Sequence, residues 1–285
     1  MDEKRFAVLI DAENVSNSYI KYILDEISNY GNVTYKRIYG DWTSAAAAGW
    51  KKQLLENSIT PVQQYSYTYG KNATDSAMII DAMDILYSGR VEGFCLVSSD
   101  SDFTRLAARL RESGMTVIGM GESKTPNSFI AACNKFKYLD ILSAADEAEA
   151  EEAAPKAEPA KKPAAQPKKT AQKAAAKKPK EEPKAEKEPK PAEPKKQQEK
   201  AIEEPRTSLR TIRRALRTIV RENSDEDNWI MVSQVGNLLD KRYTDFDVRN
   251  FGFSKLTPFL ESLDMFEIKD MKKDSSSPQK YVRLK

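Results

Sequence analysis

The 285-residue chain contains no histidine, and this absence excludes several kinds of catalytic site. Without an imidazole there is no Ser-His-Asp triad, no zinc ion held by histidine and no histidine general base. Cysteine is almost as scarce, because only Cys95 and Cys133 are present and their spacing fits no zinc site. We expect both to be core thiols of a protein in a reducing compartment.

Long apolar runs are missing as well. No stretch approaches the length of about 20 apolar residues that a membrane-spanning helix needs. The charged residues near the N-terminus do not fit a secretory signal peptide. We therefore expect a cytoplasmic protein with no membrane partner.

Composition divides the chain into three regions. Residues 1–145 are close to neutral, with 15 basic and 17 acidic side chains, and are rich enough in apolar residues to form a core. Residues 146–204 are mostly Ala, Lys, Glu and Pro and contain nine of the fourteen prolines, so we expect a disordered linker. It is either a spacer or a basic arm that holds polyanions nearby. Globular patterning returns in residues 205–285.

Short apolar runs alternate with amphipathic segments through residues 1–145, which predicts an α/β fold with a parallel sheet. The expected strands and last apolar run cover residues 6–10, 33–39, 61–65, 93–98, 116–120 and 138–142. The expected helices cover residues 16–27 and 45–55, a segment that begins near Thr74, residues 103–110 and residues 127–133.

Four aspartates fall where predicted strands end or predicted helices begin. Asp11 follows the first strand, Asp75 opens a helix, and Asp100 and Asp102 share the turn after residues 93–98. An aspartate at a helix start is commonly a cap, but capping does not explain two acids on one short turn. Ligands bind at the carboxyl ends of strands in open parallel sheets, so we expect these acids to gather there.

Crowded carboxylates repel one another and raise one another's pKa unless a cation neutralises them. Oxygen ligands without histidine or cysteine favour Mg²⁺ or Mn²⁺. Such an ion suits phosphate esters, because it activates water and neutralises charge on the leaving oxygen. The sequence therefore predicts a Mg²⁺ or Mn²⁺ site for phosphoester chemistry.

Three segments resemble the NYN family, LabA-like, of PIN-like ribonuclease domains: FAVLIDAEN at 6–14, KNATD at 71–75 and LVSSDSDF at 96–103. The resemblance covers residues 5–142 and implies a PIN-like parallel-sheet sandwich with metal-dependent cleavage of RNA, as an endoribonuclease. It implies that the catalytic metal ligands are Asp11, Asp75, Asp100 and Asp102, with Asn14 as a polar helper.

Other residues near these motifs also have expected roles. Lys71, Arg37 and Ser99 are candidates for holding phosphate. Asp81 lies six positions after Asp75, which a helix does not bring to the same point, so we leave it outside the site. Relatives often carry an acid in the helix before the last strand, where this chain has Asn134.

Residues 205–285 show the order of a winged helix-turn-helix domain. Expected helices at 209–220, 233–239 and 253–263 surround a short strand at 229–232, and two strands at 266–268 and 280–284 end the chain. We expect Ser233 to cap the second helix. The first helix has an apolar stripe and a polar side that carries Arg210, Arg213, Arg214, Arg217 and Arg221.

This C-terminal region resembles the OST-HTH/LOTUS family, which implies RNA binding. The arginines Arg210, Arg213, Arg214 and Arg217 are then candidates for contacting the RNA backbone. A solvated helix face and a surface for a protein partner are the alternative interpretations of the same pattern.

Together these features predict a ribonuclease whose C-terminal domain binds single-stranded or structured RNA. A catalytically inactive RNA-binding or scaffold protein with the same fold is the first alternative. A Mg²⁺-dependent phosphatase for small esters is the second, although it would not need a second domain. A second copy of the chain and a protein bound by the C-terminal domain are further expected partners.

Overall fold

The computed structural model describes residues 3–65, 73–153, 207–271 and 279–285. The predicted linker from residue 154 onward, and Lys71, lie outside the described residues. The described residues up to Glu152, and those from Thr207 onward, belong to one compact unit. Within the described ranges, none of the helices has the length and apolar character that crossing a membrane requires.

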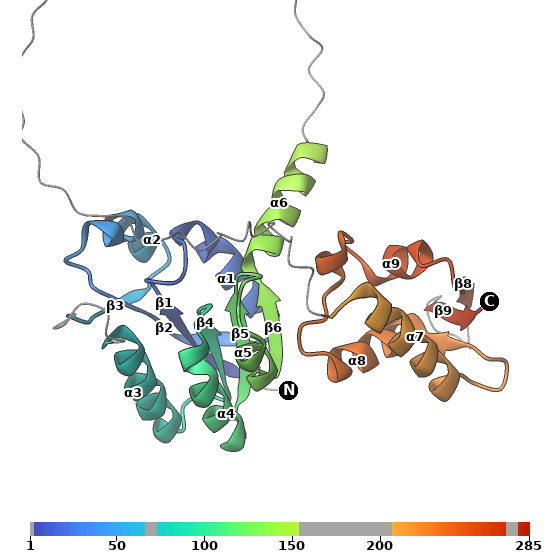
Figure 1. Cartoon of the computed structure of the whole chain (residues 1–285), viewed down its shortest axis with the longest axis horizontal. Coiled ribbons are helices and arrows are strands. Elements are labelled where there is room, and N and C mark those ends of the chain that lie inside the picture. Colours follow the sequence, from blue (N-terminus) through green and yellow to red (C-terminus); the bar gives the residue numbers. More distant parts are fainter. Residues whose placement is uncertain (1–2, 66–72, 154–206, 272–278) are drawn as a thin grey trace, which may run out of the picture. The chain divides into compact units, whose positions relative to one another are not determined.

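The N-terminal domain is built on a parallel sheet whose strands lie in the order β3-β2-β1-β4-β5-β6 (Figure 1). The strands are β1 (Arg5–Asp11), β2 (Asn32–Gly40), β3 (Thr60–Gln63), β4 (Gly93–Val97), β5 (Thr116–Gly121) and β6 (Lys135–Tyr138). The central strands β1 and β4 are apolar and buried almost throughout, as expected for strands covered on both faces. The predicted α/β fold with a parallel sheet is confirmed.

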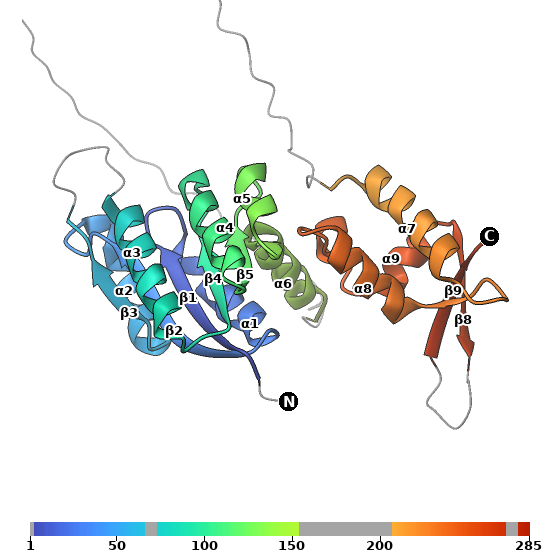
Figure 2. The same ribbon diagram turned by 90° about the horizontal axis from the view of Figure 1, so that it is seen from below.

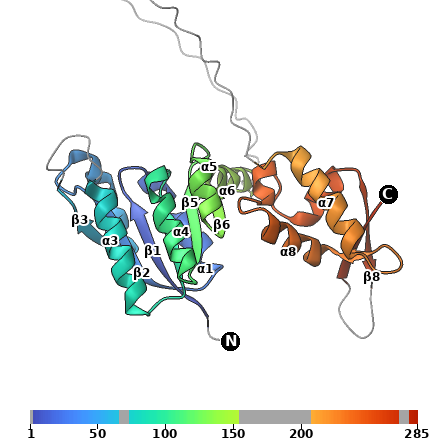
Figure 3. The same cartoon turned by 60° about the horizontal axis from the view of Figure 1, so that its bottom comes forward.

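Helices cover both faces of this sheet, so the domain has three layers (Figure 2). One face packs against α3 (Ala73–Ser88), α4 (Thr104–Glu112) and α5 (Asn127–Ala132). The other packs against α1 (Ile20–Ser28), α2 (Trp50–Glu56) and α6 (Leu139–Ala153). Residues of β1 alternate between the two cores: Ala7 and Leu9 belong to one, and Phe6, Val8 and Ile10 to the other. Figure 3 shows α3 and α4 lying across the same side of the sheet.

One expected strand in this domain has a wrong end, and the last apolar run divides between two elements. Within the run at 138–142, β6 ends at Tyr138, and Leu139 begins α6. Leu139 and Leu142 are one helical turn apart and pack in a different core from Tyr138. The helix α6 then continues to Ala153, past the expected start of the linker at residue 146, because its Ala-Glu sequence is a strong helix former. The strand expected at 61–65 ends at Gln63.

The C-terminal domain has the predicted winged helix-turn-helix order. It contains α7 (Leu209–Asn223), β7 (Ile230–Met231), α8 (Val232–Arg242), a 3₁₀ turn η4 (Val248–Phe251), α9 (Leu256–Ser262), β8 (Phe266–Met271) and β9 (Gln279–Leu284). The strands form an antiparallel sheet in the order β7-β9-β8. One correction concerns Ser233, which lies inside α8, because Met231 is the residue at the helix N-cap.

Candidate metal centre and RNA-binding surface

The acidic residues gather where the strand order of the sheet reverses direction. From β1 the chain continues outward to β2 and β3, whereas β4 is followed on the other side by β5 and β6. Asp11 is the last residue of β1, and Asp100 lies three positions after the end of β4. The crevice between two such neighbouring strand ends is the usual ligand site of an open parallel sheet.

Three of the four predicted aspartates bring their carboxylates together. Oxygens of Asp75, Asp100 and Asp102 lie within 4.8 Å of one another. Asp75 stands in the first turn of α3, and the other two flank the start of the 3₁₀ turn η3 (Ser101–Phe103). Asp100 caps this turn by accepting a hydrogen bond from the Asp102 amide at 2.9 Å. The cap holds the two acids of this turn in a fixed relation to each other.

Asp11 lies beside this triad as a fully buried carboxylate held by its neighbours. It accepts hydrogen bonds from the Ser98 hydroxyl at 2.9 Å, the Asn14 side-chain amide at 2.7 Å and the Glu13 backbone amide at 3.0 Å. Its negative charge raises the pKa of Asp75, so the two carboxylates are electrostatically coupled. Asn14, the expected polar helper, thus acts by orienting Asp11.

Crowding of these acids affects the pKa of Asp75. Burial, first, and the charges of Asp11, Asp100, Asp102 and Glu13 together raise the pKa of this carboxyl to about 6. The described part of the site therefore carries an excess of negative charge. A hard divalent cation fits such a donor set, because all its ligand atoms are carboxylate oxygens.

Two residues of the site were not predicted from the sequence. Ser98 donates to Asp11 and accepts from the Asp100 amide at 3.1 Å, so it joins the ends of β1 and β4. Glu13 accepts a hydrogen bond from the Thr74 hydroxyl at 2.9 Å and thereby joins the segment after β1 to α3. Each lies two positions from a predicted acid in the sequence, and that proximity was the available signal.

The residues with expected roles in phosphate binding differ in their surroundings. Arg37 forms an ion pair with Asp81, which also accepts a hydrogen bond from the Tyr39 hydroxyl. The guanidinium of Arg37 is thus already paired within the domain. Ser99 accepts a hydrogen bond from the Glu122 amide at 2.9 Å. Asn134, at the position where relatives carry an acid, accepts from the Val117 amide at 2.8 Å and supports the sheet instead.

Arginines line one face of α7 in the C-terminal domain. Arg210, Arg214, Arg217 and Arg221 recur at intervals of three or four residues and are exposed, so they form one basic stripe. Arg213 differs from them, because its guanidinium donates to the Leu263 carbonyl at 2.8 Å, at the end of α9. Arg213 is exposed as well, but its contact ties α7 to the end of α9 and distinguishes it from the arginines of the stripe.

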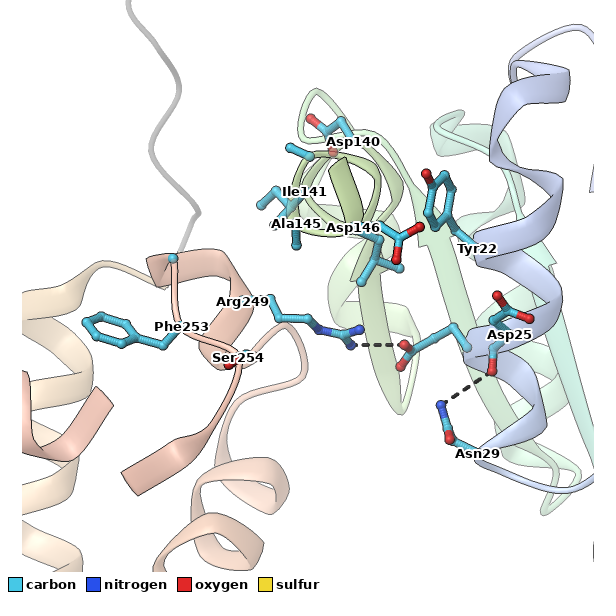
Figure 4. A pocket seen from close by; sticks show the side chains of 14 residues that line it. Tyr22, Asp25, Asn29, Asp140, Ile141, Ala145, Asp146, Arg249, Phe253 and Ser254 are labelled. Atoms are coloured by element: carbon cyan, nitrogen blue, oxygen red, sulfur yellow. Dashed lines mark hydrogen bonds and ion pairs between the residues drawn. The ribbon is translucent and has the colours of Figure 1, made fainter. Parts of the chain in front are cut away.

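A cleft elsewhere in the described chain is lined by Tyr22, Asp25, Asp140, Arg249 and Phe253, among others (Figure 4). None of the four predicted acids lines it. Asp25, Asp140 and a third aspartate, Asp146, give it a mainly negative lining, which repels phosphate. We therefore place the candidate chemistry at the acid cluster and not in this cleft.

Comparisons with known proteins match the two domains separately. Residues 5–140 match the family model of the NYN domain, and residues 206–277 match that of the OST-HTH/LOTUS domain. A similar solved structure is that of a protein of unknown function from Vibrio parahaemolyticus, at 18% sequence identity and a TM-score of 0.40. The match covers 47% of this chain and 91% of that one. The search of curated proteins found no match.

Proposed function

Because the chain carries an NYN domain, which belongs to the PIN-like nuclease superfamily, followed by an OST-HTH/LOTUS domain, we propose that it is a metal-dependent ribonuclease. It cleaves RNA internally at the acid cluster and binds RNA through its C-terminal domain. The observation that carries this proposal is the convergence of Asp75, Asp100 and Asp102 at the carboxyl edge of the sheet. Of the activities considered, RNA hydrolysis is the one that uses both domains.

Asp75, Asp100 and Asp102 would hold Mg²⁺ or Mn²⁺ in the proposed enzyme. When bound, such an ion lowers the pKa of water and neutralises negative charge on the phosphodiester. The Asp11 carboxylate is kept oriented by the hydrogen bonds that it accepts from Ser98, Asn14 and the Glu13 amide. Without the ion, burial and the neighbouring acids raise the pKa of Asp75 to about 6, and a bound cation would favour the charged carboxylate.

The basic stripe of Arg210, Arg214, Arg217 and Arg221 is the proposed RNA-binding surface. Guanidinium groups bind phosphate oxygens in pairs, and contacts of this kind fix the nucleic acid without selecting its sequence. The stripe lies on one side of α7, while Ile212, Leu216 and Ile219 on the other side pack in the domain core. Its arginines are therefore available to RNA without any rearrangement of the domain.

Cleavage of labelled single-stranded RNA by the full-length protein tests the proposed activity. Three arms contain Mg²⁺, Mn²⁺ or EDTA, and a fourth offers a small phosphate ester in place of RNA. We expect internal cleavage products with either ion, none with EDTA, and no turnover of the small ester. RNA that is bound but left intact in every arm would favour the inactive binding protein, and ester turnover alone would favour the phosphatase.

Loss of arginines from the basic stripe should weaken binding to RNA of every sequence. We expect the double substitution Arg214→Ala and Arg217→Ala to reduce affinity by about tenfold or more at low salt. The slope of log K against log salt should fall by about 1.4, since each phosphate contact on single-stranded nucleic acid contributes about 0.7. Binding measured by fluorescence anisotropy at several salt concentrations checks both numbers.

Two matched variants control this experiment. Lys241→Ala removes an exposed cation from α8 and should leave the salt slope unchanged. Arg213→Ala should lower the melting temperature of the protein, because it breaks the contact with Leu263, and should also leave the slope unchanged. A double arginine variant that binds like the wild type at all salt concentrations would remove α7 from the RNA-binding surface.

A further inference from the structure

The NYN sheet has an open edge at β6, and a residue of the OST-HTH domain binds to it. Edge strands carry N–H and C=O groups without partners in their own sheet, and such groups readily pair with other chain segments. The amide of Phe136 in β6 donates to the carbonyl of Thr244, at 2.9 Å. Thr244 lies in residues 240–249, which we call the docking segment. The edge is thus partly closed by the second domain.

Four charged side chains from both domains meet beside this backbone contact. Glu26 of α1 and Lys137 of β6 come from the NYN domain, and Asp247 and Arg249 come from the docking segment. Arg249 lies 2.9 Å from Glu26 and 2.7 Å from Asp247, and Lys137 pairs with both Glu26, at 3.4 Å, and Asp247. Figure 4 shows Arg249, whose dashed ion pair is the contact with Glu26. The two positive and two negative charges balance.

The burial of these charges distinguishes them from ordinary surface pairs. The side chains of Glu26, Asp247 and Lys137 are only 7%, 10% and 12% exposed. Burial by itself lowers the pKa of a lysine, yet Asp247, Tyr30 and Glu26 raise that of Lys137 above its ordinary value. Buried charges persist only when they are paired, and two of the partners belong to the other domain.

Two further contacts flank the network along the same edge. The Tyr138 hydroxyl donates to the buried carboxylate of Asp245 at 3.2 Å, and Lys135 pairs with Asp240 at 2.6 Å. Lysines on an edge strand can also serve to prevent aggregation while pointing into water. That explanation suits an exposed lysine but not Lys137, which is buried between two carboxylates.

We propose that the OST-HTH domain docks on the β6 edge of the NYN domain through residues 240–249, so that the two domains act as one body. The edge hydrogen bond sets the register of the docked segment, and the four-charge network holds it. Docking leaves the basic stripe of α7 exposed, so the OST-HTH domain can bind RNA while it stays docked. This inference stands independently of the proposed nuclease activity.

Hydrogen exchange of the full-length protein, read at single amides by NMR, tests the docking. The reporter is the Phe136 amide, whose acceptor lies in the other domain, and the internal control is the Asn134 amide, which donates to Val117 at 2.8 Å within the NYN domain. We expect Phe136 to be protected in the wild type. Lys137→Glu should speed its exchange by about a hundredfold or more, because it places three carboxylates together. Asn134 should change little.

A charge swap keeps the test decisive if Lys137→Glu does not fold. Lys135→Glu and Asp240→Lys should each speed exchange at Phe136 by about two- to fivefold, as expected for a partly exposed pair, and the double variant should restore the wild-type rate. An unprotected Phe136 amide in the wild type would overturn the proposal. An exchange rate at the Phe136 amide that none of these substitutions changes would also overturn it.

Discussion

Replacing Asp100 by asparagine should abolish RNA cleavage while leaving the fold and RNA binding intact. Asparagine caps a helix start as well as aspartate does, so the turn that positions Asp102 should persist. The variant nevertheless loses one negative charge from the triad that would hold the cation. We expect the single-turnover cleavage rate to fall by about a thousandfold. RNA affinity should stay the same or increase, because a charge that repels phosphate has been removed.

Asp84→Asn is the matched control for this loss. Asp84 is an exposed carboxylate of α3, the helix that carries Asp75, but it is not a member of the triad. The Asp84→Asn variant should cleave RNA at the wild-type rate. If the Asp100→Asn variant cleaved RNA as fast as the Asp84→Asn variant and the wild type, the acid cluster would not be the catalytic centre.

Replacing Asp75 by asparagine should stabilise the protein at neutral pH in the absence of divalent cations. The folded-state pKa of Asp75 is about 6, above its ordinary value of 3.8, because burial and the neighbouring acids disfavour the charged form. The folded protein therefore binds this proton more tightly than the unfolded chain, and stability is lost as pH rises from about 4 through 6. The full shift corresponds to about 3 kcal/mol, and solvent screening at this partly buried carboxyl reduces the expected loss to about 2 kcal/mol at pH 7.5.

Thermal melting of the two proteins in EDTA measures this effect. At pH 7.5 we expect Asp75→Asn to melt about 4 to 8 °C above the wild type, and the difference should vanish near pH 4. Adding Mg²⁺ should raise the wild-type melting temperature more than that of the variant, because ligand binding stabilises the folded state. A variant that melts below the wild type at both pH values would show that the carboxylates of the site do not repel one another.

The sequence was sufficient to predict the sheet and most of the acid cluster, because both depend on local patterns. Buried runs that end at Asp11 and Asp100 identify neighbouring strand ends by themselves. Asp75 opens a helix, and its place at a helix start predicted that it joins the others; the resemblance to known motifs supported the same prediction. The apolar run at 138–142 could not be assigned to one element, because a short apolar run fits a strand and a helix equally well.

The docking contacts could not be predicted from local patterns. Glu26, Lys137 and Asp247 lie in three separate segments of the sequence, and no periodicity connects them. Their pairing depends on how two domains meet across a long intervening segment. The contact of Arg213 could not be predicted either, because its acceptor, the Leu263 carbonyl, lies fifty residues away in the sequence.

Binding of Mn²⁺ and cleavage of RNA, measured in the same samples, show whether the acid cluster is both the metal site and the catalytic site. Free Mn²⁺ is followed by electron paramagnetic resonance while single-turnover cleavage is recorded at each concentration of the ion. We expect binding and cleavage to rise together in the wild type, and both to be lost when Asp75, Asp100 and Asp102 are all replaced by asparagine. Cleavage that continues in EDTA, or Mn²⁺ binding that survives the triple substitution, would contradict this expectation.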